Sequence, residues 1–374
     1  MNNSSGSYIF CSAILFFEIL VMKLMHIVLN NHKNFTESRK FSFLDPTGNV
    51  NPSTVIVGGT THARSAVLQA IVILLASVTR PHFRPNKLEW PNYRYHELQM
   101  SERPLKMEAA IEFSEKEIQD TCHYAQRLCD SGELLNICPS RHQQVVLSLN
   151  FSEKKVTIDH SIETFYQFKG YQYAKRLVVT PHDKVNLFNN VGNIVWYNKY
   201  RIPHSVTDLQ KNNAPTLNEL RTFLVNAHRN YLAIMQLNMK IQREEVDFYK
   251  KLKYFYSKIF SGISLLGSSQ DLDAQRGSDI PGFFLNEGNR YYELAELSEG
   301  ERNILPILID FSRWHINNSI IVIDQIEMGL NHNLQANFIQ SLHSLGNNNQ
   351  FIFTSSYGSV TSLLSDSKNQ VIKI

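Results

Sequence analysis

The chain has 374 residues, of which 43% are hydrophobic and 19% are charged. An apolar share of this size can fill a core, so the composition excludes wholesale disorder and collagen-like classes. Lys and Arg number 37 against 34 Asp and Glu, and this near balance argues for neither a nucleic-acid nor a membrane partner.

The N-terminal 21 residues are predicted to be an extension. The apolar run Tyr8–Val21 has no basic segment before it, contains Glu18 and is shorter than the ~20 residues that span a bilayer. The whole chain has four cysteines, too few for a disulfide-dense secreted scaffold. We therefore expect a cytoplasmic protein without a membrane partner.

Residues 22–80 are predicted to form an N-terminal lobe. Strand-like runs lie at Lys23–Leu29, Lys40–Leu44 and Thr54–Val57, and the third run leads into the glycine turn Gly58–Ser65. A helix with one apolar face is expected over Ala66–Val78. The order strand, glycine turn, helix is typical of a nucleotide-binding unit.

Residues 81–290 are predicted to be an insertion with short strands and a helical hairpin. Short strand-like runs include Val145–Phe151, Leu177–Val179 and Asn193–Tyr197. Helical spacing of apolar residues extends over Leu217–Phe260, and Ser268–Pro281 is expected to be a polar loop.

The insertion also holds four side chains of zinc-ligand type. These are Cys122, Cys129, Cys138 and His142. No paired C-x2-C spacing is present, and Cys122 and Cys129 lie seven residues apart on a predicted helix, Glu115–Leu135. The spacing favours thiols packed on a helix face and leaves a zinc site as the alternative.

Residues 291–374 are predicted to form a C-terminal lobe. A helix is expected over Ser298–Trp314, a buried strand over Ser319–Ile323, a helix over Leu334–Leu345 and a strand over Phe351–Phe353. Alternation of strands and helices predicts an α/β fold with a largely parallel sheet.

Three segments together resemble the ATP-binding head of the ABC/SMC-type (RecF/OLD-like, AAA-type) ATPases. Gly58–Ser65 resembles the Walker A loop, and Leu297–Glu301 resembles the LSxGE signature. Ile320–Asp324, followed by Gln325, Glu327, Gly329 and Leu330, resembles Walker B and its D-loop. The resemblance implies a P-loop ATPase head with an N-terminal antiparallel β portion, a largely parallel sheet and a helical insertion.

The resemblance also implies a site for ATP and Mg²⁺. Metal ligands would be Ser65 and Asp324, and the positions of the catalytic acid and the switch residue would be Gln325 and Ser356. The nucleotide-binding residues would be Gly58, Gly59, Thr60, Thr61, His62, Ala63, Arg64, Ser65 and Lys33, with Ser298, Gly300 and Glu301 from the signature.

The chain departs from the family pattern at four of these positions. Ala63 and Arg64 stand where the Walker A glycine and lysine are usual, and a planar guanidinium does not replace a compact ammonium. Gln325 cannot take a proton from water, and Ser356 stands where the family usually has histidine. Loss of a general base alone costs ~10²–10⁴ in rate, so hydrolysis is expected to be weak or lost.

The signature-like segment also has a structural interpretation that involves no nucleotide. Ser298 with Glu301 three residues on is the pattern of a helix-capping box, and the two roles are compatible. The basic-aromatic stretch Phe248–Lys258 leaves nucleic acid open as a partner, although one packed face and one solvated lysine face explain it more simply.

The predicted function is that of a degenerate ATP-binding subunit. It would act as regulator or scaffold in a multi-subunit bacterial phage-defence or DNA-maintenance complex, with a separate nuclease or toxin effector. It would form a homo- or hetero-oligomer through dimerisation of ATP-binding heads. The alternatives are a pseudo-ATPase interaction module that binds no nucleotide, and a transporter subunit, whose signature usually reads LSGGQ.

Overall fold

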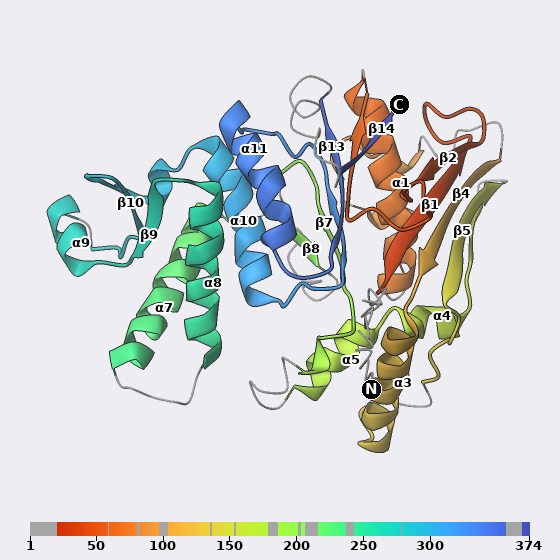
Figure 1. Ribbon diagram of the computed structural model, residues 1–374, viewed down its shortest axis with the longest axis horizontal. Helices are drawn as coiled ribbons and strands as arrows, with labels where there is room; N and C mark the ends of the chain where they lie inside the picture. Colours follow the sequence, from red (N-terminus) through yellow and green to blue (C-terminus); the bar gives the residue numbers. More distant parts are fainter. Residues whose placement is uncertain are drawn as a thin grey trace, which may run out of the picture.

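The computed structural model describes residues 21–374 except 59, 81–82, 89, 97–103, 135–136, 153–154, 179–185, 201–202, 206–215, 237–242, 278 and 357–368. Its strands form three sheets, and helices fill the space between the two larger sheets and cover the outer face of one of them (Figure 1). The predicted extension therefore lies outside the described residues except for Val21, which is buried.

The central sheet has six strands in the order β14-β3-β13-β12-β7-β8. They are β14 (Asn369–Lys373), β3 (Ser53–Val57), β13 (Gln350–Ser355), β12 (Ile320–Ile323), β7 (Ile194–Tyr197) and β8 (Pro203–Ser205). All neighbours are parallel except β7 and β8. The predicted parallel sheet is confirmed, and the carboxyl ends of β3, β12 and β13 meet at one edge because Ile323 pairs with Phe353 and Phe353 with Val55.

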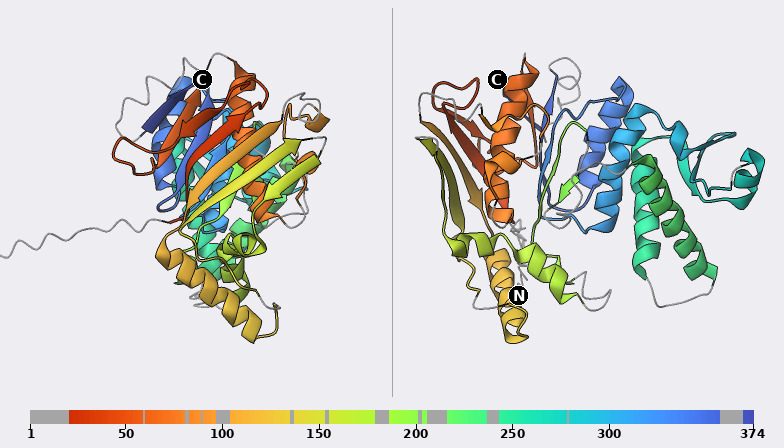
Figure 2. Two further views of the ribbon diagram at one scale, coloured as in Figure 1. Left: turned by 90° about the vertical axis from the view of Figure 1, so that its right-hand side faces the viewer. Right: turned by 180° about the vertical axis from the view of Figure 1, so that it is seen from behind.

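The second sheet is antiparallel, in the order β2-β1-β4-β5-β6. It consists of β2 (Arg39–Ser42), β1 (Lys23–Asn30), β4 (Leu105–Glu112), β5 (Gln144–Ser152) and β6 (Lys155–Asp159). Figure 2 shows this sheet face-on in its left view. The predicted N-terminal antiparallel portion is confirmed, and it pairs strands from residues 22–80 with strands from 81–290.

Helix α1 (Thr61–Thr79) lies between these two sheets (Figure 1). Every residue from Arg64 to Thr79 is buried, because each side of the helix faces a sheet. The predicted helix Ala66–Val78 is present, and it is buried on all sides rather than on its apolar face alone. Among the residues described, α1 is also the helix long and apolar enough to span a membrane, but 78% of that stretch is buried inside the protein, as in a core helix.

Four helices pack beyond the other face of the central sheet. They are α7 (Leu217–Gln236), α8 (Arg243–Ile259), α10 (Glu299–Arg313) and α11 (His332–Ser341). The predicted helical hairpin is confirmed as α7 and α8, which pack against each other. Helix α8 buries Phe248, Tyr249, Phe255 and Tyr256 and exposes Lys250, Lys253 and Lys258, so these four aromatic side chains belong to the core, whereas Tyr254 is exposed.

A small sheet continues from the hairpin. It pairs β9 (Ile263–Gly267), β10 (Phe284–Glu287) and β11 (Arg290–Glu293) in the order β11-β10-β9. The expected loop Ser268–Pro281 contains helix α9 (Gln270–Arg276), so that prediction was wrong. Ser269 caps its first turn and Gly277, with a φ of 65°, ends it, so local capping is enough to form this short helix.

A third cluster of helices lies at one end of the antiparallel sheet. It contains α3 (Glu115–Asp130), α4 (Ile162–Gln167) and α5 (Gly170–Leu177). Leu177, expected in a strand, is the last residue of α5. Three short 3₁₀ helices occur at Pro85–Lys87, Leu294–Glu296 and Leu342–Ser344. No group of three or more metal-type ligands occurs within the described parts of the chain, so nothing favours the zinc alternative.

Candidate nucleotide-binding edge

The carboxyl edge of the central sheet brings three oxygen-bearing side chains together. Ser65 Oγ, in the second turn of α1, lies 3.3 Å from each carboxylate oxygen of Asp324, which directly follows β12. Thr354, near the end of β13, donates its hydroxyl to Asp324 Oδ1 at 2.7 Å. All three residues are buried. The two positions expected to hold magnesium, 259 residues apart in the chain, are therefore adjacent.

The turn before α1 is shorter than the sequence predicts. The helix begins at Thr61, and the Thr60 side chain accepts from Ala63 N at 3.4 Å as its N-cap. Arg64 N donates to Thr60 O, so it already belongs to the helical ladder. Residues expected to wrap around phosphate thus form a helical turn, with Thr61 and His62 exposed on it. Gly59 lies outside the described residues.

Arg64 occupies the position of the Walker A lysine but points at main-chain carbonyls. Its Nη1 donates to Gly58 O at 2.9 Å and to Ser355 O at 2.8 Å, and Nη2 donates to Thr61 Oγ1 at 3.2 Å. The side chain is 6% exposed. Arg64 therefore ties together the end of β3, the end of β13 and the first turn of α1.

Gly58 needs to be glycine for a packing reason. A Cβ built on it would lie 2.6 Å from the carbonyl oxygen of Ile374, which follows β14. Ile374 N also donates to Val57 O at 2.9 Å, so β14 holds this position from the side. Close approach of a neighbouring strand is enough to require the absence of a side chain here.

The positions of the catalytic acid and the switch are linked through Glu327 and Thr354. Gln325 has a φ of 49°, which is uncommon for a residue with a side chain, and its N–H donates to Thr354 Oγ1 at 2.8 Å. Ser356 N donates to Glu327 Oε1 at 2.8 Å. The other oxygen of Glu327 is buried without a hydrogen-bond partner among the residues described. This loop therefore keeps one carboxylate beside the switch position although Gln325 has lost its own.

The signature segment forms the predicted capping box at the start of α10. Ser298 Oγ accepts from Glu301 N at 3.3 Å, and Glu301 Oε2 accepts from Ser298 N at 2.9 Å and from Ser298 Oγ at 2.7 Å. Glu301 Oε1 accepts from the hydroxyls of Tyr256 and Tyr292 at 2.7 and 3.0 Å. Burial, strengthened by the Glu301 carboxylate, raises the pKa of both tyrosines, so they remain donors.

The first turn of α10 packs against the loop that follows the Walker B-like strand. A Cβ on Gly300 would lie 2.7 Å from Gly329 O, and Asn303 Nδ2 donates to Met328 O at 3.1 Å. Only a glycine permits this approach. The signature and the D-loop-like segment are therefore one packed unit in this chain.

Lys33 is in the turn after β1. It contacts α1 further from the start of that helix than the other predicted nucleotide-binding residues lie. Its ammonium donates to Gln69 Oε1 at 2.6 Å, and it lies 5.7 Å from the ring of Tyr93. The neighbouring His32 approaches Ala66 O at 3.2 Å, and burial, with the Lys33 charge, lowers its pKa to about 4. A neutral His32 thus braces α1 against the turn after β1.

The residues at the edge fit magnesium better than they fit a triphosphate. A carboxylate and a hydroxyl are the ligands that Mg²⁺ takes from a protein when nucleotide phosphates and water supply the rest. Asp324 and Ser65 provide this pair. The phosphate end fits poorly, because Arg64 is bonded to carbonyls and the expected loop is helical.

Several contributors were not predicted. Thr354 and the Ser355 carbonyl hold Asp324 and Arg64, and Tyr256 and Tyr292 hold Glu301. A hydroxyl residue at the end of Phe351–Phe353 was a usable signal, because the carboxyl ends of neighbouring parallel strands share an edge. The tyrosines gave no such signal, since they reach Glu301 from separate elements.

Solved structures with a similar course are SMC head domains. The chain resembles the SMC head domain from Thermotoga maritima with 14% identity, a TM-score of 0.42 and coverage of 92% of each chain. It resembles a crystallised SmcHead bound to the C-winged helix domain of ScpA with 13% identity, a TM-score of 0.47 and coverage of 91% of this chain and 92% of that one.

A third similar structure is the Smc head domain bound to the C-terminal domain of ScpA derived from Pyrococcus furiosus, with 12% identity, a TM-score of 0.46 and coverage of 92% of each chain. With TM-scores below 0.5, these likenesses add nothing to the fold that the strand order establishes. No curated protein matches the chain.

Residues 194–355 match a family described as "AAA domain, putative AbiEii toxin, Type IV TA system". The matched segment starts at β7, ends with β13, and includes the signature-like and Walker B-like segments. The resemblance to an AAA-type ATPase head, stated from the sequence, is thereby confirmed for this part of the chain.

Proposed function

We propose that the protein is a nucleotide-responsive ATPase-head subunit that binds Mg-ATP weakly and hydrolyses it slowly or not at all. The observation that carries this proposal is the contact between Ser65 and Asp324, buried at the carboxyl edge of a parallel sheet. A hydroxyl and a carboxylate at this edge are the ligands that the magnesium of a bound nucleotide takes from a protein.

The weak affinity for Mg-ATP follows from the residues at the phosphate end of the site. Arg64 would have to release the carbonyls of Gly58 and Ser355 before its charge could reach a phosphate. Gln325 cannot accept a proton, so no side chain at that position would activate water. When bound, the ATP phosphates would supply the negative charge that draws Arg64 away from the carbonyls, and Mg²⁺ would be held by Ser65 and Asp324.

Isothermal titration calorimetry with ATP and magnesium tests the proposal. The wild type is expected to bind in a magnesium-dependent way at millimolar ATP. Asp324→Asn and Ser65→Ala should each weaken binding by about tenfold or more, since each removes a magnesium ligand. Asp130→Asn, on an exposed position of α3, is the matched control and should bind as the wild type does. Binding that is absent, or equal in all four proteins, overturns the proposal in favour of a pseudo-ATPase interaction module.

We further propose that the signature acts on a second head. Ser298 is exposed at the start of α10, where helix N–H groups and the helix dipole favour an anion. In a cytoplasmic heterodimer, this end would complete the nucleotide site of a partner with an intact Walker A lysine. The chain would then serve as regulator or scaffold beside a separate nuclease or toxin effector in phage defence or DNA maintenance.

This second step has its own test. Ser298→Ala should lower ATP turnover of the co-purified heterodimer without preventing assembly, whereas Asp324→Asn should leave the partner's turnover largely intact. Equal turnover in Ser298→Ala and the wild type would overturn the role in trans. DNA cleavage by the purified chain alone with magnesium would overturn the separate effector.

A further inference from the structure

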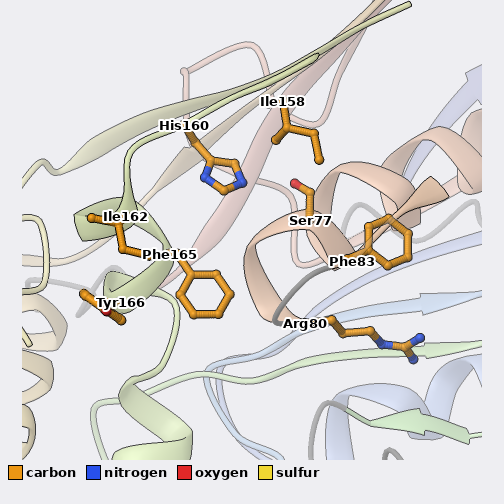
Figure 3. A pocket seen from close by; sticks show the side chains of 8 residues that line it. All are labelled: Ser77, Arg80, Phe83, Ile158, His160, Ile162, Phe165 and Tyr166. Atoms are coloured by element: carbon orange, nitrogen blue, oxygen red, sulfur yellow. The ribbon is translucent and has the colours of Figure 1, made fainter. Parts of the chain in front are cut away.

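A cavity of about 450 Å³ lies at the end of α1 that is remote from the nucleotide-binding edge. Its walls come from the last turn of α1, the residue Phe83, the end of β6 and helix α4 (Figure 3). The 19 residues of α1 place this cavity about 27 Å from Thr61, so it is separate from the ATP-like site. Its volume falls within the roughly 300–1,000 Å³ of small-molecule pockets.

The walls of the cavity are mainly aromatic and aliphatic. Phe83, Phe165 and Tyr166 supply rings, and Ile158 and Ile162 supply branched side chains. Ile162 is 56% exposed and so gives the mouth an apolar rim. Rings of this kind bind a flat ligand by stacking on its faces, as they do with a nucleobase.

One polar atom in the wall has no partner. His160 Nε2 is buried and makes no hydrogen bond within the described structure. The other ring nitrogen, Nδ1, lies 3.4 Å from Ser161 O, and a carbonyl can only accept. The neutral tautomer that makes this contact carries its proton on Nδ1 and a lone pair on Nε2. Figure 3 shows this ring and the Ser77 hydroxyl directed into the same space.

The charge of the wall limits the ligand further. The described lining includes Arg80 and no carboxylate, so it disfavours a cationic ligand. The Arg80 guanidinium lies 4.9 Å from the ring of Trp196, toward the central sheet. Lys169, 4.1 Å from the ring of Phe165, adds a second basic group beside the wall.

We propose that this cavity binds a free nucleoside or nucleoside monophosphate through its base. The base stacks on the aromatic wall and donates a ring-edge N–H to His160 Nε2. A flat ring, a donor at its edge, and a neutral or anionic tail are the three properties that the wall selects. A ligand here would contact both the last turn of α1 and helix α4.

Adenosine, adenosine 5′-monophosphate and N6,N6-dimethyladenosine are the probes, titrated by calorimetry into the full chain. The dimethylated base keeps its stacking face but has lost its amino donor. Adenosine and its monophosphate should bind at one site. The dimethyl compound should bind about tenfold more weakly, the effect of leaving a buried acceptor unpaired.

The variants separate this site from the nucleotide-binding edge. His160→Leu should weaken adenosine about tenfold and abolish its advantage over the dimethyl compound. Its melting temperature should fall little, because Nε2 has no partner and Nδ1 makes only a long, exposed contact with Ser161 O at 3.4 Å. Ile162→Trp places a larger side chain in the mouth of the cavity from an exposed position and should also weaken adenosine binding. It replaces His160→Leu in the test if that variant does not fold. His123→Leu, exposed on α3, and Asp324→Asn should bind adenosine as the wild type does.

Four results would overturn the assignment, and the first three concern adenosine. These are no adenosine binding at millimolar concentration, unchanged binding in both His160→Leu and Ile162→Trp, and binding that disappears in Asp324→Asn. A hexanucleotide that binds far more tightly than the monophosphate would also overturn it, because the affinity would then come from surface outside the cavity. If ATP does not bind at the nucleotide-binding edge in calorimetry, the proposal for this cavity still stands.

Discussion

Arg64 donates to the carbonyl oxygen of Ser355 at 2.8 Å, across 291 residues of chain. A guanidinium in this position fastens β13 to the first turn of α1, where a lysine would reach for phosphate. Stability and nucleotide affinity therefore compete for the same side chain. This competition explains how the edge can retain the Ser65–Asp324 pair while Arg64 binds main-chain carbonyls and offers no charge to a phosphate.

Replacement of Arg64 by lysine should separate the two roles. Arg64→Lys loses part of the three-way contact with Gly58, Thr61 and Ser355, so the free energy of unfolding should fall by about 1–2 kcal/mol. A compact ammonium is freer to meet phosphate, so ATP should bind several-fold more tightly. Urea unfolding and calorimetry measure the two effects. Arg64→Met is the matched control, with the same loss of stability and no gain in affinity; an equal gain in both variants would refute the competition.

Gln325→Glu should restore the missing acid. The substitution keeps the length of the side chain and the φ of 49°, so the fold should not change. In an Arg64→Lys background saturated with ATP and magnesium, phosphate release should rise by about 10²-fold, the lower range for a general base. Gln325→Asn, which cannot accept a proton, is the control. A rate that does not rise at saturating ATP would show that the water site itself is absent.

Local sequence patterns predicted the parts of this site that depend on neighbours in the chain. The Ser298–Glu301 capping box and the aspartate after a buried strand needed only spacing and burial, and both are present. The start of α1 depended on Thr60 acting as N-cap, which the glycine turn obscured. The partner of Arg64 lies in β13, and no local pattern reveals a contact between residues so distant in sequence.

The antiparallel sheet shows the same limit. Strands β4 and β6 lie in the stretch that was least regular in sequence, where prolines and short alternating runs mask the strand period, whereas β5 matches the predicted run Val145–Phe151. The pairing of β4 with β1 and with β5 is fixed by the core that these strands share with α1, in which Met107, Leu147 and Leu149 are fully buried. Tertiary burial, not local propensity, decided those strands.

The signature glutamate should be worth more to stability than its exposed neighbour. Glu301 accepts from Ser298 and from the hydroxyls of Tyr256 and Tyr292, and it is 6% exposed. Glu301→Gln places an amide donor against other donors, so unfolding free energy should fall by about 1–3 kcal/mol. Glu299→Gln, in the same turn but exposed, should cost under about 1 kcal/mol. Equal costs in urea unfolding would contradict the buried network.

A last prediction concerns Lys169, which is 5% exposed and donates to Thr79 O. Burial lowers its pKa from 10.5 to about 7. Between these two values the unfolded chain binds more protons than the folded one, so this group makes the protein more stable as pH rises from about 7 toward 10. At pH 7 and below, the folded protein carries the cost of a buried charge.

Lys169→Met removes that charge and keeps a long apolar side chain. The variant should therefore be more stable than the wild type at pH 7, by about 1–3 kcal/mol once the lost contact with Phe165 is subtracted. The stability advantage of Lys169→Met should shrink steadily toward pH 10, where the Lys169 side chain of the folded wild type is already a neutral amine. Lys116→Met, on a half-exposed residue paired with Asp120, should show no such trend. A lower melting temperature for Lys169→Met at pH 7 would mean that the Thr79 and Phe165 contacts outweigh desolvation.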